Sequence, residues 1–274
     1  MAKILPPLGV YARVAEIAEV HDFLVGLENG PGLSVLPTFQ PLYRPKRKRT
    51  GLGHLPRVEP GKRCLVLGRS GSGKTAGAAW LLQQSLPVTK KWVILNPKDD
   101  ELLARMGPSV DWEPQAILDA LKTNNIVVVH PDASILSDPM KLDKPLFDLV
   151  ETEKPISFLI DELLYFQKGN STAGPGIMGL LTRGRSRGQA MIATTQRPAN
   201  ISQYFYSEAN YYAIYSLTQP ADQDRVTDFT NQPDLARERK PFYWEWYDVD
   251  KNISQEFGPI PYRKLLQQFP SKES

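Results

Sequence analysis

The sequence predicts an α/β protein of the doubly wound class, with a mostly parallel central sheet and helices on both of its faces. Three observations predict this class. After residue 62, short apolar runs alternate with helical stretches. Several of these runs are continuously apolar, which is typical of parallel strands buried on both faces. The 274 residues, 41% of them hydrophobic and 23% charged, are enough to bury a full core.

The expected elements follow from these runs. Strands are predicted at residues 64–67, 92–95, 126–129, 156–160, 190–194 and 211–217, and helices at 74–86, 113–121 and 177–187. An amphipathic helix is predicted at 12–28 and an edge hairpin at 241–247 and 252–257. We therefore expect an N-terminal helix and basic arm at 1–58, an α/β core at 59–235, and a C-terminal hairpin and tail at 236–274 packed on the core.

Composition excludes several classes of protein. The net charge is only +3, so nucleic-acid binding has to be argued from local clusters. The single cysteine, Cys64, permits no internal disulfide, and the three histidines lie too far apart for a zinc signature. No stretch approaches the roughly 18 apolar residues of a membrane span, and residues 1–7 lack a signal-peptide core. We expect no transmembrane segment and a cytoplasmic location.

A phosphate-binding loop is predicted at residues 68–75, which match the pattern G-x-x-x-x-G-K-[ST] at every fixed position. Glycines let backbone N–H groups converge on phosphate oxygens, at a helix N-terminus that favours anions. Lys74 is expected to bind the β- and γ-phosphates of ATP, and the Thr75 hydroxyl to bind Mg²⁺. The alternative is a glycine-rich turn without a ligand. The predicted nucleotide-binding set is Gly68, Arg69, Ser70, Gly71, Ser72, Gly73, Lys74, Thr75 and Ala76.

Two adjacent acids, Asp161 and Glu162, end the strand predicted at 156–160. Asp161 is expected to hold Mg²⁺ opposite Thr75. Glu162 is expected to polarise the attacking water as a general base. A water-activating Glu beside the metal-binding acid is typical of ATPases that drive motion, so the pair favours hydrolysis over phosphoryl transfer to a small molecule. The alternative is a helix N-cap, where such acids are common.

Further candidate catalytic residues flank the strand predicted at 190–194. Gln196 follows it and is expected to contact the γ-phosphate or the attacking water. Before it, Arg183, Arg185 and Arg187 recur at every second position. In a ring, one of them could reach the γ-phosphate of the neighbouring subunit, a contact worth about 10³–10⁵ in rate. The alternative is a set of surface arginines near a helix C-terminus.

The sequence resembles the FtsK/HerA superfamily of DNA-pumping ATPases over roughly residues 60–230. Beyond the loop and the acid pair, Val-Ile-Leu-Asn-Pro-Lys at 93–98, followed by Glu-Leu at 101–102, is similar to a strand-tip signature of that family. Asn96 replaces the usual Asp in it. Residues 185–198 are similar in spacing to the family's segment of an arginine, a strand and Thr-Gln-Arg-Pro.

This resemblance implies a RecA-like core of the ASCE type, a homohexameric ring, and double-stranded DNA in its pore. It assigns the trans-acting arginine to Arg185, with Arg183 and Arg187 as competitors. Size and missing modules make the chain most similar to the genome-packaging ATPases of membrane-containing icosahedral viruses. We therefore expect an ATP-driven translocase of double-stranded DNA that contacts mostly phosphates, with a pore loop at 168–175.

The sequence is also compatible with two other functions. One is an ATP-gated virion assembly or secretion factor that does not pump DNA, and another is a RecA-like helicase acting on single strands. The basic run at 44–49 is expected to grip DNA, a capsid vertex or anionic lipid, or to be a solvated linker. A viral protein of this kind would be found in the host cytoplasm and with the virion, where a capsid-vertex or membrane protein would be a further partner.

Overall fold

The computed structural model describes residues 55–152, 154–168 and 172–269, which belong to a single compact unit, Arg47–Ser274. The helix predicted at 12–28 and the basic run at 44–49 lie outside the described residues, and the division into three regions stays a prediction. Within the described part of the chain, no helix is both long enough and apolar enough to cross a bilayer.

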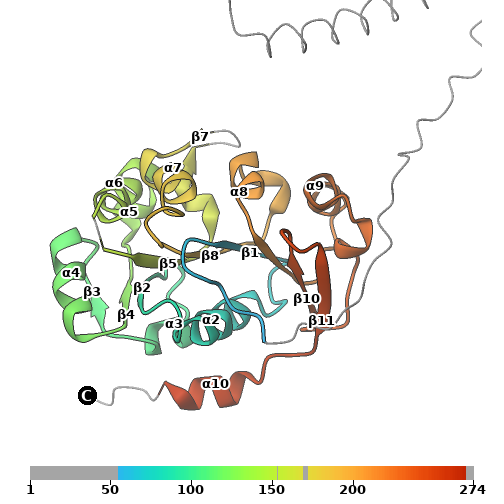
Figure 1. Cartoon of the computed structure of the whole chain (residues 1–274), viewed down its shortest axis with the longest axis horizontal. Coiled ribbons are helices and arrows are strands. Elements are labelled where there is room, and N and C mark those ends of the chain that lie inside the picture. The colour runs from blue at the N-terminus through green and yellow to red at the C-terminus, as the bar shows by residue number, and fades with distance from the viewer. Residues whose placement is uncertain (1–54, 153, 169–171, 270–274) are drawn as a thin grey trace, which may run out of the picture. The chain divides into compact units, whose positions relative to one another are not determined.

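A nine-stranded sheet runs through the described residues in the order β11-β10-β9-β1-β8-β5-β2-β4-β3 (Figure 1). The strands from β9 to β3 pair in parallel, whereas β10 is antiparallel to both β9 and β11. Their bounds are β1 Arg63–Leu67, β2 Lys91–Leu95, β3 Ser109–Val110, β4 Ile126–Val129, β5 Ile156–Asp161, β8 Met191–Thr195, β9 Tyr211–Ile214, β10 Trp244–Asp248 and β11 Ile253–Phe257.

Helices cover both faces of this sheet. One face carries α2, α3 and α10, and the other carries α6, α7 and α8 (Figure 1). The helices are α2 Lys74–Ser85, α3 Glu101–Arg105, α4 Pro114–Thr123, α5 Ala133–Leu136, α6 Pro139–Val150, α7 Pro175–Thr182, α8 Gln203–Ser207, α9 Pro220–Thr230 and α10 Tyr262–Gln268. Short 3₁₀ turns lie at η1 Leu163–Phe166, η2 Pro198–Asn200 and η3 Pro233–Leu235, and a small hairpin pairs β6 Gln167–Lys168 with β7 Thr172–Ala173.

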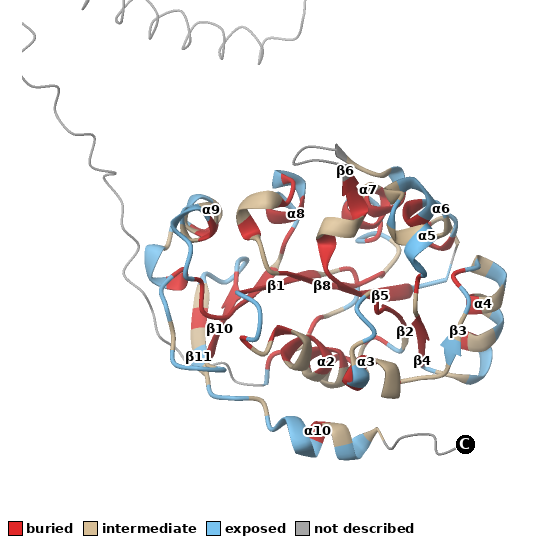
Figure 2. Ribbon diagram, turned by 180° about the vertical axis from the view of Figure 1, so that it is seen from behind, coloured by how far each residue is buried: buried red, intermediate tan, exposed pale blue. Residues whose placement is uncertain are grey.

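The alternation of side chains along β1 explains why its residues are continuously apolar. Leu65 and Leu67 join the apolar cluster beneath α6 and α7, whereas Cys64 and Val66 join the cluster beneath α2 and α3. Successive side chains of a strand point to opposite faces, so a strand covered on both sides needs apolar residues throughout. Figure 2 shows the central strands as buried along their length. The predicted fold class is confirmed, including the antiparallel hairpin at the edge of the sheet.

Two predicted elements end earlier than the sequence indicated. The helix predicted at 177–187 stops at Thr182, because the chain turns at Gly184 and again at Gly188, whose φ is 68°. The strand predicted at 211–217 stops at Ile214, because its partner β1 ends at Leu67. The backbone beyond β9 instead follows the loop after β1, where the Arg69 N–H donates to the Ser216 carbonyl at 3.1 Å.

Candidate active site

The predicted phosphate loop connects β1 to α2 and has a backbone that only glycines adopt readily. Gly73, just before α2, has φ 98°, in the left-handed region that L side chains avoid. At Gly68 a Cβ atom would lie 2.6 Å from the Cβ of Tyr215, which is too close for any side chain. The loop therefore has its conformation fixed at both ends, and its amides are presented at the start of a twelve-residue helix.

Lys74 begins α2 and lies back across the loop. Its ammonium donates to the Arg69 carbonyl at 2.8 Å, and the residue is almost fully buried. Burial, and then the nearby charge of Lys98, lower the pKa of Lys74 to about 8, against the opposing effect of Glu162 and Asp161. A charged group held in a partly dry position gains strongly from an anionic ligand, so this ammonium is suited to a phosphate oxygen.

Thr75 and Asp161 come together from segments 86 residues apart. The Thr75 hydroxyl lies 3.4 Å from a carboxylate oxygen of Asp161, and the Thr194 hydroxyl donates to the same oxygen at 2.9 Å. This contact arises because β8 lies between β1 and β5 and all three are parallel, so their carboxyl ends meet at one edge. The other Asp161 oxygen is buried without a hydrogen bond among the described residues.

These oxygens fit a magnesium ion. Mg²⁺ takes few protein ligands, keeps several waters and prefers carboxylate and hydroxyl oxygens. A threonine hydroxyl and a carboxylate a few ångströms apart, with a second carboxylate oxygen that makes no hydrogen bond among the described residues and faces only the Lys98 ammonium, meet that requirement. Among the described residues there is no cluster of three or more His, Cys, Asp and Glu side chains that would suit a metal bound by protein alone.

Lys98 belongs to the site but was not among the predicted site residues. It follows β2, the neighbour of β5, and its ammonium lies 3.4 Å from Asp161 and 3.3 Å from Glu162. The two carboxylates are almost completely buried, so their charges need a cation nearby. The sequence did contain a signal for Lys98, namely the Asn-Pro-Lys segment that follows β2. Because β2 and β5 are parallel neighbours, the residues after their carboxyl ends lie close together.

Glu162 has an unusual backbone. Its φ of 99° is rare for a residue with a side chain, and one of its carboxylate oxygens is buried without a hydrogen bond in the described part of the chain. Strained backbone conformations persist where the surrounding structure enforces them, and they concentrate at functional sites. Here the conformation turns the chain sharply after β5 and leaves Glu162 within reach of Lys98 at the sheet edge.

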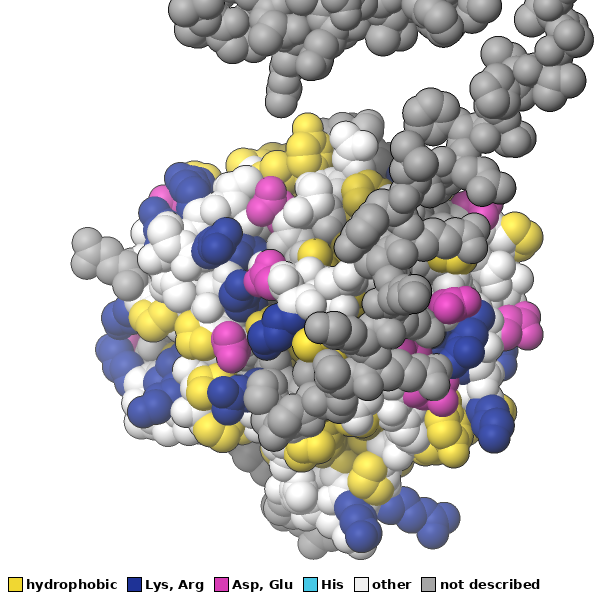
Figure 3. All heavy atoms as spheres, turned by 45° about the vertical axis from the view of Figure 1, so that its right-hand side comes forward, with side chains coloured by type: hydrophobic (Ala, Val, Ile, Leu, Met, Phe, Trp, Pro, Cys, Tyr) yellow, Lys and Arg dark blue, Asp and Glu magenta, His cyan; other side chains and the backbone are white. Residues whose placement is uncertain are grey.

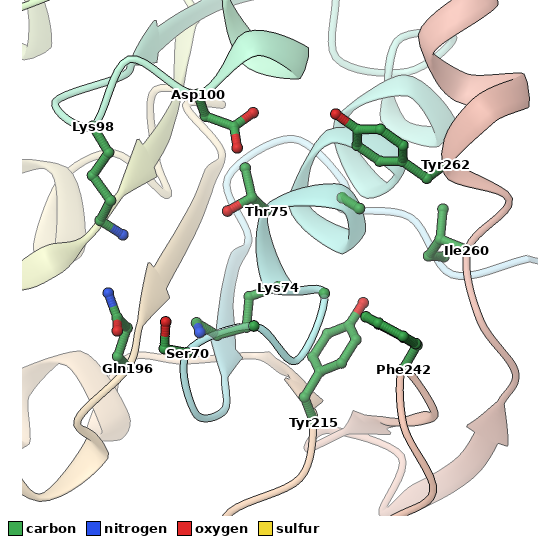
Figure 4. Close-up of a pocket in the computed structure, with 13 residues that line it drawn as sticks. Ser70, Lys74, Thr75, Lys98, Asp100, Gln196, Tyr215, Phe242, Ile260 and Tyr262 are labelled. Carbon is green, nitrogen blue, oxygen red and sulfur yellow. The ribbon is translucent and has the colours of Figure 1, made fainter.

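A cavity of about 520 Å³ opens above the loop (Figure 4). It brings together six of the nine predicted nucleotide-binding residues with Gln196, whereas Gly68, Arg69 and Ser72 complete the loop without lining the cavity. Polar side chains, among them Lys98 and Gln196, lie at one end and apolar ones at the other. The lining residues that the sequence argument missed are Lys98, Asp100, Tyr215, Phe242, Ile260 and Tyr262.

The three arginines do not enter this cavity. Arg183 and Arg187 both form ion pairs with Glu151, whereas the exposed side chain of Arg185 has no ion pair or hydrogen bond with any described residue. The Arg185 carbonyl packs against Gly61, where a Cβ would lie 2.6 Å away, just before β1. Five strand residues, about 17 Å, then separate that end of β1 from the phosphate loop. Arg185 therefore lies near the amino-terminal ends of the parallel strands, whereas the phosphate loop of its own chain lies at their carboxyl ends.

A buried glutamine joins two loops at the carboxyl edge of the sheet. The Gln167 side-chain amide donates to the Asn200 carbonyl, and its oxygen accepts from the Ser202 N–H at 3.0 Å. Gln167 belongs to the β6–β7 hairpin that follows the acid pair, and residues 200–202 follow Gln196. The two segments downstream of β5 and β8 are thus tied to each other by side-chain hydrogen bonds.

The fold and this arrangement define a P-loop protein of the RecA-like type, with the loop pattern at 68–75 and a buried aspartate and glutamate at the end of a nearby strand. No protein-family model matches the chain. The chain is homologous to the DNA packaging ATPase P9 of Enterobacteria phage PRD1, with 28% identity over 214 residues, 73% of this chain and 88% of P9.

Solved structures support the same fold. The genome packaging NTPase B204 of Sulfolobus turreted icosahedral virus 2, in complex with ATP-gammaS, matches with a TM-score of 0.61 and 20% identity, over 73% of this chain and 98% of that one. VirB4 of Thermoanaerobacter pseudethanolicus matches with a TM-score of 0.55 and 9% identity, over 74% and 90%. The homology to P9 and the match to B204 confirm the resemblance to viral packaging ATPases, which the size of the chain and its missing modules had indicated.

Proposed function

We propose that this chain is an ATPase that translocates double-stranded DNA and serves as a viral genome-packaging motor. The observation that carries the proposal is the homology to DNA packaging ATPase P9, which extends over most of that protein. The site supports it, because Lys74, Thr75 and Lys98 line the cavity, and the buried Asp161 and Glu162 lie directly behind them, 3.4 Å from Thr75 and 3.3 Å from Lys98 respectively.

Each residue of the phosphate end has a role in the proposed mechanism. The loop amides and Lys74 bind the β- and γ-phosphates of ATP, and Thr75 and Asp161 hold the metal. Mg²⁺ bound there neutralises the phosphate charge. Glu162 accepts the proton of the attacking water, and Gln196 orients that water or the γ-phosphate. Lys98 compensates the charges of the two acids, a role that Mg²⁺ would supply when bound.

Arg185 completes the site from a second subunit. Its side chain is free of partners among the described residues, and it lies across the sheet from its own phosphate loop. It can therefore act only on the nucleotide of a neighbour, which a ring of identical subunits provides. The hexameric ring is part of this proposal, as is a DNA path lined by the β6–β7 hairpin within the predicted pore loop at 168–175.

The proposed substrate path requires contacts to DNA phosphates rather than to bases. On the face shown in Figure 3, Lys and Arg side chains are scattered, with Asp and Glu side chains between them. We propose that the phosphate path is assembled from several subunits around a ring. A capsid vertex or membrane protein is the proposed docking partner, and the protein acts in the host cytoplasm and at the virion.

The test is ATP hydrolysis by the full chain with Mg²⁺, measured with no DNA, with double-stranded DNA and with single-stranded DNA, together with the mass of the assembly in the presence of ATP-gammaS. We expect stimulation by double-stranded DNA and a ring-sized mass. Hydrolysis that does not respond to double-stranded DNA would favour an assembly or secretion factor. Stimulation by single strands alone would favour a helicase.

A further inference from the structure

The apolar end of the cavity has no role in binding phosphate or metal. It is formed by Phe242, Ile260 and Tyr262, which follow the α/β core in the sequence, together with Ala76 at the first turn of α2. We propose that this end is a nucleobase-binding site, in which the base of the nucleotide stacks between Phe242 and Tyr262. This proposal rests on the proposed ATPase function and adds the residues that select the base.

The two aromatic side chains are exposed in a way that calls for a ligand. Phe242 is 52% and Tyr262 is 43% exposed, and they are two of only six large hydrophobic side chains exposed in the described part of the chain. Both line the same cavity. Apolar surface gathered at the wall of a pocket is typical of a ligand site, because a ligand removes it from water.

Phe242 is held in place at an energetic cost. Its φ of 64° lies in the left-handed region, which is a marked outlier for a bulky residue. Its ring lies against the phosphate loop, since a Cβ on Gly73 would be 3.2 Å from Phe242 Cδ1. The strained backbone thus directs an exposed aromatic ring to the rim of the loop, where buried packing does not explain it.

Tyr262 is positioned by the packing of α10. Leu265 of this helix is buried in the cluster that contains α2, and the side chains of Gln268 and Gln83 form a hydrogen bond between the two helices. α10 therefore lies along α2, as Figure 1 shows. Its first residue, Tyr262, is brought to the cavity beside Thr75 and Ala76, and its hydroxyl points in the direction of Asp100 (Figure 4).

The order of residues along the cavity matches the order of groups in a nucleotide. Lys98 and Gln196 lie at one end, where the proposed mechanism places the γ-phosphate, and Lys74 lies between them and the aromatic cluster (Figure 4). A triphosphate that follows the loop from Lys98 toward Ala76 leaves its nucleoside at Phe242, Ile260 and Tyr262. A cavity of about 520 Å³ is of the size that nucleotide-like ligands occupy.

The chemistry of this end predicts a preference for purines. Aromatic stacking acts on any base, but it grows with the area of the ring system, so a purine gains more than a pyrimidine. The side chains proposed to contact the base are the aromatic rings of Phe242 and Tyr262 and the aliphatic side chain of Ile260. ATP and GTP should therefore bind with similar affinity, and CTP and UTP more weakly.

The experiment is a binding titration of nucleotides and of inorganic tripolyphosphate, in Mg²⁺, to the full chain and to Phe242→Gly, Tyr262→Ala and the double variant. Each single change should weaken ATP binding by about tenfold, since one stacked ring is lost. Tripolyphosphate, which has no base, should bind all four proteins equally. Tyr204→Ala is the matched control, because Tyr204 is 46% exposed but does not line the cavity.

Phe242→Gly also separates a binding effect from a folding effect. Glycine adopts the left-handed φ freely, so the melting temperature should be unchanged or higher while ATP affinity falls. Unchanged ATP affinity in the double variant would overturn the proposal, and so would equal losses for ATP and tripolyphosphate. Neither outcome touches the response of hydrolysis to double-stranded DNA, which tests the proposed function independently.

Discussion

The two ends of the cavity are lined by different kinds of chemical group. The phosphate end uses backbone amides, glycines with fixed conformations, and charged groups such as Lys74 and Asp161 on adjoining strand ends. The apolar end uses side chains only, and apart from Ala76 they belong to segments that follow the predicted core at 59–235. The difference separates two kinds of consequence: changes at the phosphate end should alter turnover, whereas changes at the apolar end should alter affinity alone.

The largest effect is expected from Arg185→Ala, which tests whether this residue serves the phosphate end of the cavity. Turnover should fall by about 10³-fold or more, because charge that develops on the γ-phosphate loses its cation. Steady-state ATPase assays on the purified protein measure this. Arg183→Ala is the control, since Arg183 pairs with Glu151 in its own chain.

A mixing experiment decides whether Arg185 acts in trans. Subunits with Arg185→Ala keep an intact loop, and subunits with Lys74→Ala keep an intact arginine, so a mixture should regain activity that neither protein has alone. A mixture as inactive as its components would place the arginine's role within its own chain.

Glu162→Gln should have the next largest effect. Loss of the general base should lower turnover by about 10²–10⁴-fold, with ATP affinity retained because the amide keeps the size of the side chain. Single-turnover hydrolysis and a binding titration together make the measurement. A variant that hydrolyses ATP at the normal rate would remove Glu162 from the mechanism.

Lys98→Ala should change stability more than affinity. Removing this ammonium leaves the buried Asp161 and Glu162 carboxylates together without a cation, which should cost roughly 1–3 kcal/mol, a value reduced because Lys98 is partly exposed. Mg²⁺ and ATP should stabilise the variant more than the parent protein in thermal unfolding. Lys122→Ala, which breaks an exposed pair with Asp119, serves as the control and should shift stability by less than about 0.5 kcal/mol. Equal shifts for the two variants would contradict the bridging role of Lys98.

The last comparison concerns Tyr215, which lines the cavity between its two ends, and the smallest effect is expected for Tyr215→Phe. Gly77→Ala should destabilise the protein by about 1–3 kcal/mol, because the new methyl would lie 2.0 Å from the Tyr215 hydroxyl. Tyr215→Phe should be nearly neutral, since that hydroxyl is buried without a hydrogen bond among the described residues. Chemical denaturation of both variants and of the double variant, in which the clash is partly relieved, tests this. A large loss on Tyr215→Phe would reveal a partner for the hydroxyl.

The sequence allowed the loop before α2 and the approach of Thr75 to Asp161 to be predicted, because phosphate-binding chemistry restricts the residue type at each of these positions. A loop such as 68–75 tolerates few substitutions, and the acid pair marks the end of an apolar strand. The parallel sheet was predictable for a similar reason, since strands covered on both faces must be apolar throughout.

The remaining parts were missed where the local pattern is weak or the contact is remote. α6 contains Pro145, and a proline within a segment normally predicts that a helix ends there. The segment is nevertheless helical on both sides of Pro145, and it packs against α7. α9 is largely polar and shows little periodicity. The apolar end of the cavity depends on Phe242 and Tyr262 reaching α2 from far along the chain, and no local spacing encodes that approach.

The Gln167 side chain has a mechanical consequence. Because it binds the backbone at both Asn200 and Ser202, the segment that begins at Gln196 cannot shift without pulling on the hairpin that follows Glu162. A displacement of that segment would therefore also move β6. Two hydrogen bonds of one side chain couple the segment after Gln196 to the first strand of the hairpin.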